Sequence, residues 1–358
     1  MKFAGRCWLL LMACLLGATA TAAEDAVERG ADWLLKQQAD DGGWHSATYG
    51  TMQSGVGNTA LVLDALSRMP AEWRAEHAAE ISRGVRFLLA NLDDTGYLTA
   101  PRRSADFPTY ATALLLTALD RLDSQEFLTE REQMRRYLRE VQGSDPDSHF
   151  GGWSQVGGEL EDARSESNFN LSVTRHAMEA LTGGEAARPS RENAIKFVES
   201  CRNVDDGGFF FLPTADDPLN KAGVTDSGAA RSYGTATADG ILALLACQVP
   251  AEDERIQAAL RWLEKNPIVT KVPDYGRRGS VVHADTALCF YYFAALARVM
   301  ERFPLSMLAT HRETLSKEVT RLQQLDGSWS NPNKLMREDD PLIATAFALT
   351  ALTMVPAE

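Results

Sequence analysis

The stretch GADWLLKQQADDGGW, residues 30–44, combines an aromatic residue, paired glutamines, acidic residues, two glycines and a tryptophan. Residues 26–38 contain few β-branched side chains and are typical of a helix. Gly42 and Gly43 provide the left-handed backbone with which a helix often ends. Trp44 can then fold back onto the helix while its indole N–H finds an acceptor. The stretch therefore predicts a helix whose end is closed by a tryptophan.

Similar stretches recur along the chain at a spacing of about 50 to 65 residues. A period of this size indicates a repeat architecture, and each unit has room for two helices. Five of the stretches align on an aromatic residue, and the sixth aligns through its glutamines. They are residues 30–44, 82–98, 134–153, 194–211, 259–276 and 317–329, with Trp33, Phe87, Tyr137, Phe197 and Trp262 as the aligned aromatics.

An apolar segment follows each of these stretches. Five of the six contain a threonine, five further residues and Ala-Leu, and the fifth in order is three residues longer: 59–66, 112–119, 174–181, 237–244, 286–296 and 345–352. The first helix of each unit is charged along one face, whereas most of these segments are apolar nearly all round, which indicates burial on every side. We expect an outer layer of amphipathic helices around an inner layer of apolar ones.

The two ends of the chain decide between an open and a closed array. Open arrays of repeats need terminal units with a polar outer face. The last segment, LIATAFALTALTM (342–354), has no charged residue, and the first hairpin is as apolar as the middle ones. We therefore predict an all-α protein, a single (α/α)6 toroid of six helical hairpins over residues 23–358, with no second domain.

The repeated stretch also carries a family resemblance. Residues 30–44 resemble the glutamine-tryptophan repeat of squalene and oxidosqualene cyclases, and the chain after residue 22 resembles the prenyltransferase and squalene-oxidase repeat family. The first repeat is a specific match, and the later five are progressively looser. The resemblance implies an α/α toroid in which the glutamine stacks on the tryptophan and braces adjacent helices. The motif is then structural and not catalytic.

Residues 1–22 have the order of a secretory signal peptide, with Lys2 and Arg6, then an apolar stretch, then small residues. A buried first helix is the alternative, and residues 11–14 loosely resemble a lipoprotein box that ends in Cys14. We expect cleavage after Ala22 or Ala23 and an exported protein, periplasmic or secreted. No later segment has the roughly 20 apolar residues that span a bilayer.

The charge of the chain argues against some partners. Residues 1–22 carry two basic and no acidic residues, so without them the formal net charge falls from −13 to −15. Such a surface repels nucleic acid and anionic lipid, so we expect neither as a partner. Cys201, Cys247 and Cys289 remain after cleavage. An odd number at wide spacing is not a disulfide framework, and we expect buried thiols, with one bridged pair as the alternative.

The six inner helices should begin at one rim, because each follows an outer helix that runs the other way. Their N-termini carry partial positive charge and favour an anionic or hydrogen-bonding ligand. Polar residues at these starts are therefore candidate binding residues, although Asn and Asp are also preferred helix caps. The predicted substrate-binding residues are Asn58, Tyr110, Asn168, Tyr233 and Asp340, with Asn170 and Asp339 beside them. The far rim is expected to lack a comparable polar set.

The zinc site of the protein prenyltransferases can be compared residue by residue. Those enzymes bind zinc through Asp, Cys and His. Asp285 matches the aspartate, but Ala287 stands in place of the cysteine, and Ile343 and Ala344 stand where the histidine would fall. Cys289 is one helical turn from Asp285 and is a poor substitute without the histidine. We predict no metal and no other cofactor.

The proton donor of squalene-hopene-type cyclases is the middle acid of Asp-X-Asp-Asp. The nearest match is VHADTA (282–287), where Ala284 replaces that acid. His283 and Asp285 remain as the predicted catalytic pair, since a histidine near an aspartate can act as a general base. Helix capping is their alternative role. Arg175 and His176 interrupt an apolar segment and indicate either a polar channel or a hydrogen-bonded core.

Three functions remain open. The first is an exported toroid, lacking the zinc set and the proton donor, that binds a small-molecule or polymeric ligand or a partner protein in its central cavity. The second is a carbohydrate hydrolase or lyase, which needs two carboxylates about 5 to 10 Å apart. The third is a scaffold that binds protein at an acidic rim. A fold alone does not choose among them.

Overall fold

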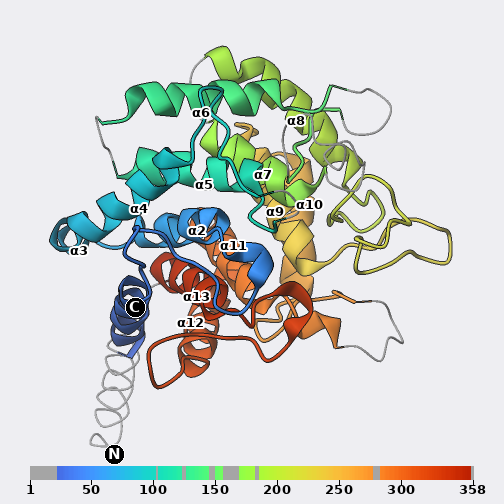
Figure 1. The fold of residues 1–358 in the computed structure, drawn as a ribbon. Coiled ribbons are helices and arrows are strands. Elements are labelled where there is room, and N and C mark those ends of the chain that lie inside the picture. Colours follow the sequence, from blue (N-terminus) through green and yellow to red (C-terminus); the bar gives the residue numbers. More distant parts are fainter. Residues whose placement is uncertain are drawn as a thin grey trace, which may run out of the picture.

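The computed structural model describes residues 22–101, 104–122, 126–144, 150–155, 169–181, 185–276 and 283–355. Outer and inner helices alternate along the chain and form two layers (Figure 1). The outer helices are a helix over 22–36, α4 (Ala78–Ala90), α6 (Leu128–Glu140), α8 (Arg188–Ser200), α10 (Glu254–Lys265) and α12 (Arg312–Arg321). The inner helices are α2 (Val56–Leu66), α5 (Pro108–Arg121), α7 (Leu171–Ala180), α9 (Gly234–Ala246), α11 (Cys289–Arg302) and α13 (Pro341–Met354).

The inner helices form a closed ring. Each packs against the next in chain order, and α13 packs against α2. At the seam, Gln323 Nε2 donates a hydrogen bond to the carbonyl of Ala26 at 2.8 Å, and the Tyr49 hydroxyl donates to Asp339 at 2.5 Å. The predicted (α/α)6 toroid is confirmed, and its first and last repeats cover each other.

Tryptophans close three of the outer helices in the same way. The indole N–H of Trp44 donates to the carbonyl of Leu34 at 2.6 Å, within the helix that precedes it. Its backbone N–H donates to the Thr59 hydroxyl of the following inner helix at 2.8 Å. Two other repeats show the same pair of bonds, from Trp153 to Leu138 and Thr174 and from Trp329 to Val319 and Thr345. All three indoles are fully buried.

The glutamines of the same repeats join neighbouring outer helices. Gln38 Nε2 donates to the carbonyl of Gly42 in its own turn and to that of Glu80 in α4, both at 2.9 Å. The equivalent bonds run from Gln142 to Gly151 and Ser190 and from Gln323 to Gly327 and Ala26. The stretch that recurs in the sequence is therefore a brace between repeats.

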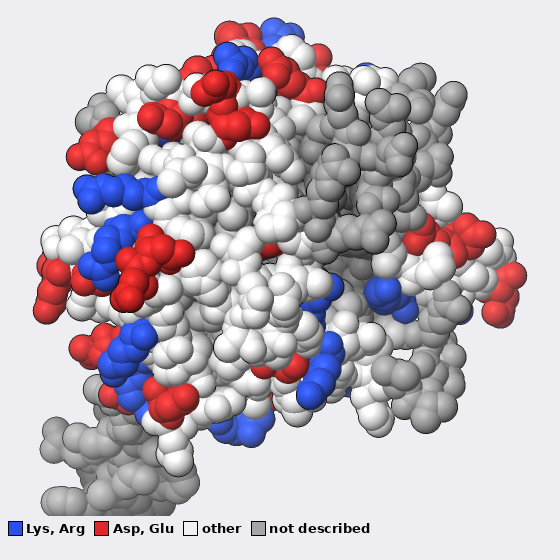
Figure 2. Space-filling model, viewed as in Figure 1, with Lys and Arg blue, Asp and Glu red and all other residues white. Residues whose placement is uncertain are grey.

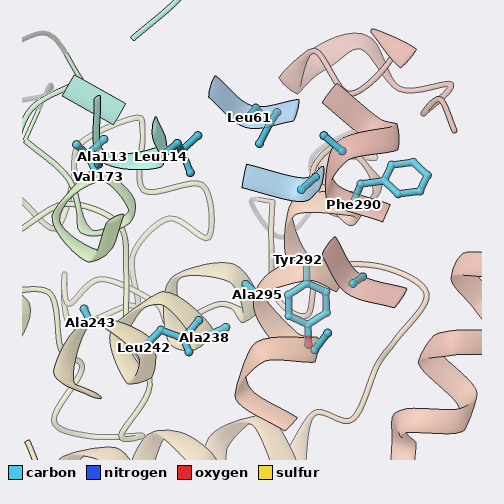
Figure 3. Packing of buried hydrophobic residues seen from close by; sticks show 14 of the residues in the cluster. Leu61, Ala113, Leu114, Val173, Ala238, Leu242, Ala243, Phe290, Tyr292 and Ala295 are labelled. Atoms are coloured by element: carbon cyan, nitrogen blue, oxygen red, sulfur yellow. The ribbon is translucent and has the colours of Figure 1, made fainter. Parts of the chain in front are cut away.

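The inner layer contains the apolar core. Leu61 of α2, Leu114 of α5 and Leu242 of α9 project into the space between the inner helices (Figure 3). On the face shown in Figure 2, most charged side chains lie along the edges, and the middle is largely uncharged. Within the described ranges, no helix is both long and apolar enough to cross a bilayer. Cys201, Cys247 and Cys289 are free and buried, so no bridge joins a pair of them.

The fifth inner helix begins later than the sequence predicts. The expected segment starts at Thr286, but α11 starts at Cys289, after a short 3-10 turn, η5 (Ala284–Thr286). The carboxylate of Glu338, from the last repeat, accepts the backbone N–H groups of Phe290 and Tyr291 at 3.1 and 2.8 Å. A distant side chain thus caps this helix, and the residues before it lie outside the helix.

Candidate functional site

A cavity of about 440 Å³ opens at the rim where the inner helices begin. Every inner helix contributes a residue from its first turn to the wall: Asn58, Tyr110, Ser172, Thr235, Tyr291 and Ile343. Loops between the repeats complete the wall, including Leu219 and Lys221 from the loop between α8 and α9. The volume falls within the range of small-molecule sites, and most of the wall side chains are apolar or aromatic.

The predicted binding residues have different positions. Asn58, Tyr110 and Tyr233 line the cavity. Asp340 is not among the described residues of the wall. It caps α13 by accepting the Leu342 N–H at 2.9 Å, and it also accepts a hydrogen bond from Ser46. Asn168 lies outside the described residues. The structure thus places Asn58, Tyr110 and Tyr233 in the cavity wall, and their role in ligand binding stays a prediction.

The predicted catalytic pair also lies away from the cavity wall. His283 precedes the η5 turn and is exposed, and Asp285 is half-buried within that turn. The Asp285 carboxylate accepts a hydrogen bond from Lys271 Nζ at 2.7 Å. Neither residue is among the described residues that line the cavity. The late start of α11 accounts for this, because it leaves both residues in the approach to the helix.

Asn58 has an unusual environment for a buried side chain. It is 1% exposed, and neither its amide oxygen nor its amide nitrogen has a hydrogen-bond partner in the described part of the chain. Buried polar groups in native proteins are nearly always paired. Asn58 lies in the cavity wall, but its two amide atoms have almost no accessible surface, so a bound molecule supplies the missing partners only if the neighbouring side chains move.

Asp106 places a carboxylate on the same wall. One oxygen accepts the Gly57 backbone N–H at 3.1 Å, and the other is buried without a partner among the described residues. A Cβ atom at Gly57 would lie 2.6 Å from the Asp106 carbonyl oxygen, so only glycine allows this approach. The loop before α5 is therefore held against the start of α2, next to Asn58.

The floor of the cavity is a polar cluster on α7, α9 and α11. Asp239 accepts a hydrogen bond from Arg175 Nη1 at 2.7 Å and bonds from the Tyr291 hydroxyl at 2.8 and 2.9 Å. The Tyr291 hydroxyl also lies 2.5 Å from Ser172 Oγ. Burial raises the pKa of Asp239 above its usual value, although the charge of Arg175 opposes this shift.

Below the floor, the cluster continues along the axis of the toroid. Glu179 accepts bonds from Arg175 Nε at 3.0 Å and from Arg298 at 2.7 Å. Burial, followed by the charge of Arg175, holds the pKa of His176 well below its usual value, so this side chain is neutral. Its ring packs edge-on against Tyr110, with 4.6 Å between centroids. Arg175 and His176 thus belong to a buried polar core.

The far rim differs from the prediction. The ends of the inner helices surround a depression of about 720 Å³ that is lined by several charged side chains, so the expectation of a rim without a polar set was wrong. The charged residues in its wall are Arg68, Arg74, Arg121, Glu179, Arg298, Glu301 and Arg302. Cations at helix C-termini are favoured by the helix dipole, and the sequence does not reveal that so many of them meet.

No group of three His, Cys, Asp or Glu side chains within the described ranges is arranged to hold a metal ion. The Cys289 sulfur lies 3.7 Å from the backbone carbonyl of Asp285, while the Asp285 carboxylate is directed to Lys271. Burial raises the pKa of the Cys289 thiol far above its usual value, which disfavours the thiolate that zinc needs.

Some residues of the cavity were not singled out from the sequence. Asp239 is the one charged residue in the apolar segment TADGILAL (237–244), and that isolation was a usable signal. Asp106 and Arg337 lie in loops, where no periodicity marks them. Tyr291 lies within the aromatic run of residues 290–293, and the sequence alone does not indicate which of these side chains faces the cavity.

Comparisons with known proteins agree with this architecture. The chain is similar to solved structures of type II terpene cyclase MstE from Scytonema, of a protein from Actinoplanes, and of cellobiose 2-epimerase from Bacillus thermoamylovorans. For an MstE variant in complex with geranylgeranyl dihydroxybenzoate, the TM-score is 0.63 at 12% identity, covering 95% of this chain and 99% of the other. For the Actinoplanes protein these values are 0.62, 17%, 93% and 99%. For the epimerase they are 0.61, 10%, 90% and 95%.

Identities this low establish the shared fold alone. Among curated proteins, no match was found. The family model described as the prenyltransferase alpha-alpha toroid domain matches residues 1–266. The six hairpins, the closed ring and this match together place the chain in the prenyltransferase alpha-alpha toroid domain family.

Proposed function

We propose that this protein binds a small, largely apolar molecule with a polar end in its central cavity. The observation that carries the proposal is the Asn58 side chain, which is buried in the cavity wall with both amide atoms unpaired within the described part of the chain. An unpaired buried group costs about 1–3 kcal/mol of stability. A ligand that donates to the amide oxygen and accepts from the nitrogen removes that cost.

The rest of the wall indicates the chemistry of the ligand. Its apolar and aromatic side chains fit a hydrocarbon or aromatic body. Lys221 and Arg337 contribute cationic groups from the loops of the wall, and the Arg337 guanidinium lies 5.9 Å from the centroid of the Tyr49 ring. The convergent helix N-termini also favour an anionic or strongly hydrogen-bonding end. The geranylgeranyl dihydroxybenzoate bound by MstE is a molecule of this type.

A carbohydrate-active enzyme is the second candidate. Two carboxylates, Asp106 and Asp239, line the same cavity, together with aromatic rings that can stack on a sugar, and cellobiose 2-epimerase shares the fold. Both oxygens of Asp239 already accept hydrogen bonds from Arg175 or the Tyr291 hydroxyl, which argues against this candidate because the carboxylate has less capacity to exchange a proton with a substrate.

Two further parts of the proposal come from the sequence. We propose that residues 1–22 direct export, so that the mature chain begins at Ala23 or Glu24, which intact mass measurement of the secreted or periplasmic protein tests. The mature protein would lack the zinc set and the Asp-X-Asp-Asp donor, since Ala287 and Ala284 stand at those positions. His283 and Asp285 keep a proposed catalytic role only if their substitution changes turnover or binding.

Calorimetric titration of residues 23–358 with geranylgeranyl dihydroxybenzoate and with cellobiose tests the proposal. We expect the first compound to bind, and Asn58→Leu to weaken that binding about tenfold or more. The free energy of unfolding without ligand should not fall, because the variant removes an unpaired buried amide. Asn193→Leu on outer helix α8 is the matched control and should bind normally.

Each alternative predicts a different result. Binding of cellobiose alone would favour the carbohydrate enzyme. Binding of neither compound would contradict the proposal and leave the protein-binding scaffold. Equal affinity of the wild type and Asn58→Leu would show that the unpaired amide plays no part in recognition.

A further inference from the structure

The depression at the far rim gathers arginines from separate parts of the chain. Arg68 follows the end of α2, Arg74 lies in α3 (Ala71–Glu76), Arg121 ends α5, and Arg298 and Arg302 lie in the last turns of α11. The whole chain has a formal net charge of −13, so a concentration of five cations at one end of the toroid opposes the general charge of the protein.

The carboxylates in and below this depression are shared between arginines. Asp64 is paired with both Arg68, at 3.2 Å, and Arg121, at 2.6 Å. Glu179 is paired with Arg298 at 2.7 Å and, on its other side, with Arg175 of the cavity floor. A guanidinium has five N–H donors, so one shared carboxylate cannot satisfy two of these side chains. Arg68 also contacts the Met354 sulfur at 4.0 Å and Arg121 donates to Ser67 Oγ at 3.1 Å, which still leaves N–H groups on Arg121 and Arg298 for a further acceptor.

Two of the arginines have fewer partners still. Arg74 donates from Nη1 to the carbonyl of Arg121 at 3.2 Å, but its Nε is buried without a partner in the described part of the chain. Arg302 is exposed, and no ion pair joins it to another described residue. Among the described residues of the wall, Glu301 has the only carboxylate outside these shared pairs.

The buried arginines also repel one another. Burial lowers the pKa of Arg68 to about 10, and the charges of Arg298 and Arg121 add to this shift against the attraction of Asp64. Burial likewise lowers the pKa of Arg298, with Arg175 and Arg121 acting in the same direction. An anion in the depression would relieve this repulsion.

We propose that the far-rim depression binds a phosphate group, either as the free ion or as the end of a larger molecule. Guanidinium groups bind phosphate oxygens through paired, charge-assisted hydrogen bonds. The volume of about 720 Å³ leaves room for a molecule attached to the phosphate. The site lies at the opposite end of the inner helices from the central cavity, so it does not depend on the function proposed above. The competing explanation is that the arginines only offset the helix dipoles, which requires no ligand.

Titration of residues 23–358 with inorganic phosphate and with glycerol 3-phosphate, at constant ionic strength adjusted with chloride, separates these explanations. We expect saturable binding and a higher melting temperature with phosphate than with chloride alone. Arg302→Gln should weaken binding about threefold or more. Its melting temperature without phosphate should stay unchanged, because Arg302 is exposed. Glu301→Gln should strengthen binding by a similar factor.

A matched control and the comparison of probes complete the test. Arg86→Gln, an exposed arginine on outer helix α4, should leave the affinity unchanged. Similar affinities for the two probes would assign the site to the phosphate group itself, and tighter binding of glycerol 3-phosphate would assign it to a phosphate ester. The proposal is wrong if neither probe binds at millimolar concentration, or if the three variants change the affinity alike.

Discussion

Arg175 and Asp239 form a buried ion pair, 2.7 Å between Nη1 and Oδ1, on the axis of the toroid. Both side chains are at most 3% exposed. Asp239 lines the central cavity, and Glu179, the other partner of Arg175, lines the depression at the far rim. One ion-pair network therefore separates the two hollows of the molecule and connects their walls.

Removal of Asp239 should be strongly destabilising. Asp239→Ala leaves the buried Arg175 with one carboxylate fewer and should lower the free energy of unfolding by about 3–5 kcal/mol. Urea unfolding of the variant and the wild type measures the difference. Glu192→Ala is the control, since its exposed pair with Arg188 should contribute about 1 kcal/mol or less. Equal losses of unfolding free energy in the two variants would mean that the buried Arg175–Asp239 pair stabilises the fold no more than an exposed pair does.

Trp44 should stabilise the fold without contributing to ligand binding. Trp44→Ala removes a fully buried indole and its bond to Leu34 and should cost about 3–5 kcal/mol. At low temperature, the affinity of the cavity for its ligand should stay nearly the same. Lost binding at full stability would instead assign Trp44 to the pocket.

The space occupied by Trp44 can be tested from its neighbour. A Cβ atom at Gly84 of α4 would lie 2.7 Å from the Trp44 ring. Gly84→Ala should therefore cost about 1–3 kcal/mol in the wild type and much less in the Trp44→Ala background. A double-mutant cycle in urea measures the coupling. Additive effects would show that the two residues do not meet in solution.

The position of Asp285 predicts a small effect on ligand binding. Its carboxylate is paired with a Lys271 side chain that is about half exposed, at 47%, and not with the cavity. Asp285→Ala should change the free energy of unfolding by no more than about 1 kcal/mol and leave the affinity for geranylgeranyl dihydroxybenzoate unchanged. His283→Ala should behave alike. A large loss of turnover or affinity in either variant would restore the pair to the catalytic role that the sequence suggests.

Glu338 should make stability depend on pH near neutrality. Burial raises its pKa to about 7, against the backbone N–H of Tyr291 and the amide of Asn331, which lower it. The folded chain therefore holds this proton at pH values where the unfolded chain has lost it, and stability falls as the pH rises from about 4.5 to about 7. Glu338→Gln removes this contribution.

The variant has only one oxygen to accept the Phe290 and Tyr291 N–H groups, so it should be less stable than the wild type near pH 5. Raising the pH to 8 should shift the difference in favour of the variant by up to about 3 kcal/mol, because only the wild type loses the contribution of the proton. Chemical unfolding of both at several pH values gives the comparison. A constant difference across this range would contradict the raised pKa.

Zinc binding provides a direct check on the family resemblance. We expect the purified protein to hold no stoichiometric zinc, because Ala287 and Ala344 occupy positions where the protein prenyltransferases have ligands. Elemental analysis after dialysis measures the metal content. One tightly bound zinc per chain that is lost in Asp285→Ala would overturn the expectation.

Much of the fold could be predicted because its determinants are local. The alternation of amphipathic and apolar segments defines the two layers, and the apolar ends of the chain predict a closed ring. The spacing of Gln38, Gly42 and Trp44 is short enough for the sequence alone to indicate the closed helix end. Arg175 and His176, which interrupt an apolar segment, were likewise recognisable as part of either a polar channel or a hydrogen-bonded core.

The site depended on contacts between residues far apart in the chain. The start of α11 is set by Glu338, 48 residues beyond Phe290 in sequence, and this displaced His283 and Asp285 from the positions that periodicity predicts. Only the tertiary structure shows that the buried Asn58 amide has no hydrogen-bond partner among the described residues.

The amino-acid sequence by itself determined the repeat, the two layers and the braces, because periodic burial and helix ends depend on residues within a few turns of one another. Only the tertiary structure decided which polar groups meet. The arginines of the far rim come from helix ends that are distant in sequence, and Asp106 reaches the cavity through a close approach at Gly57. The reason is physical: closing the ring brings six helix starts together at one rim and six helix ends at the other, and no local pattern records which side chains then face each other.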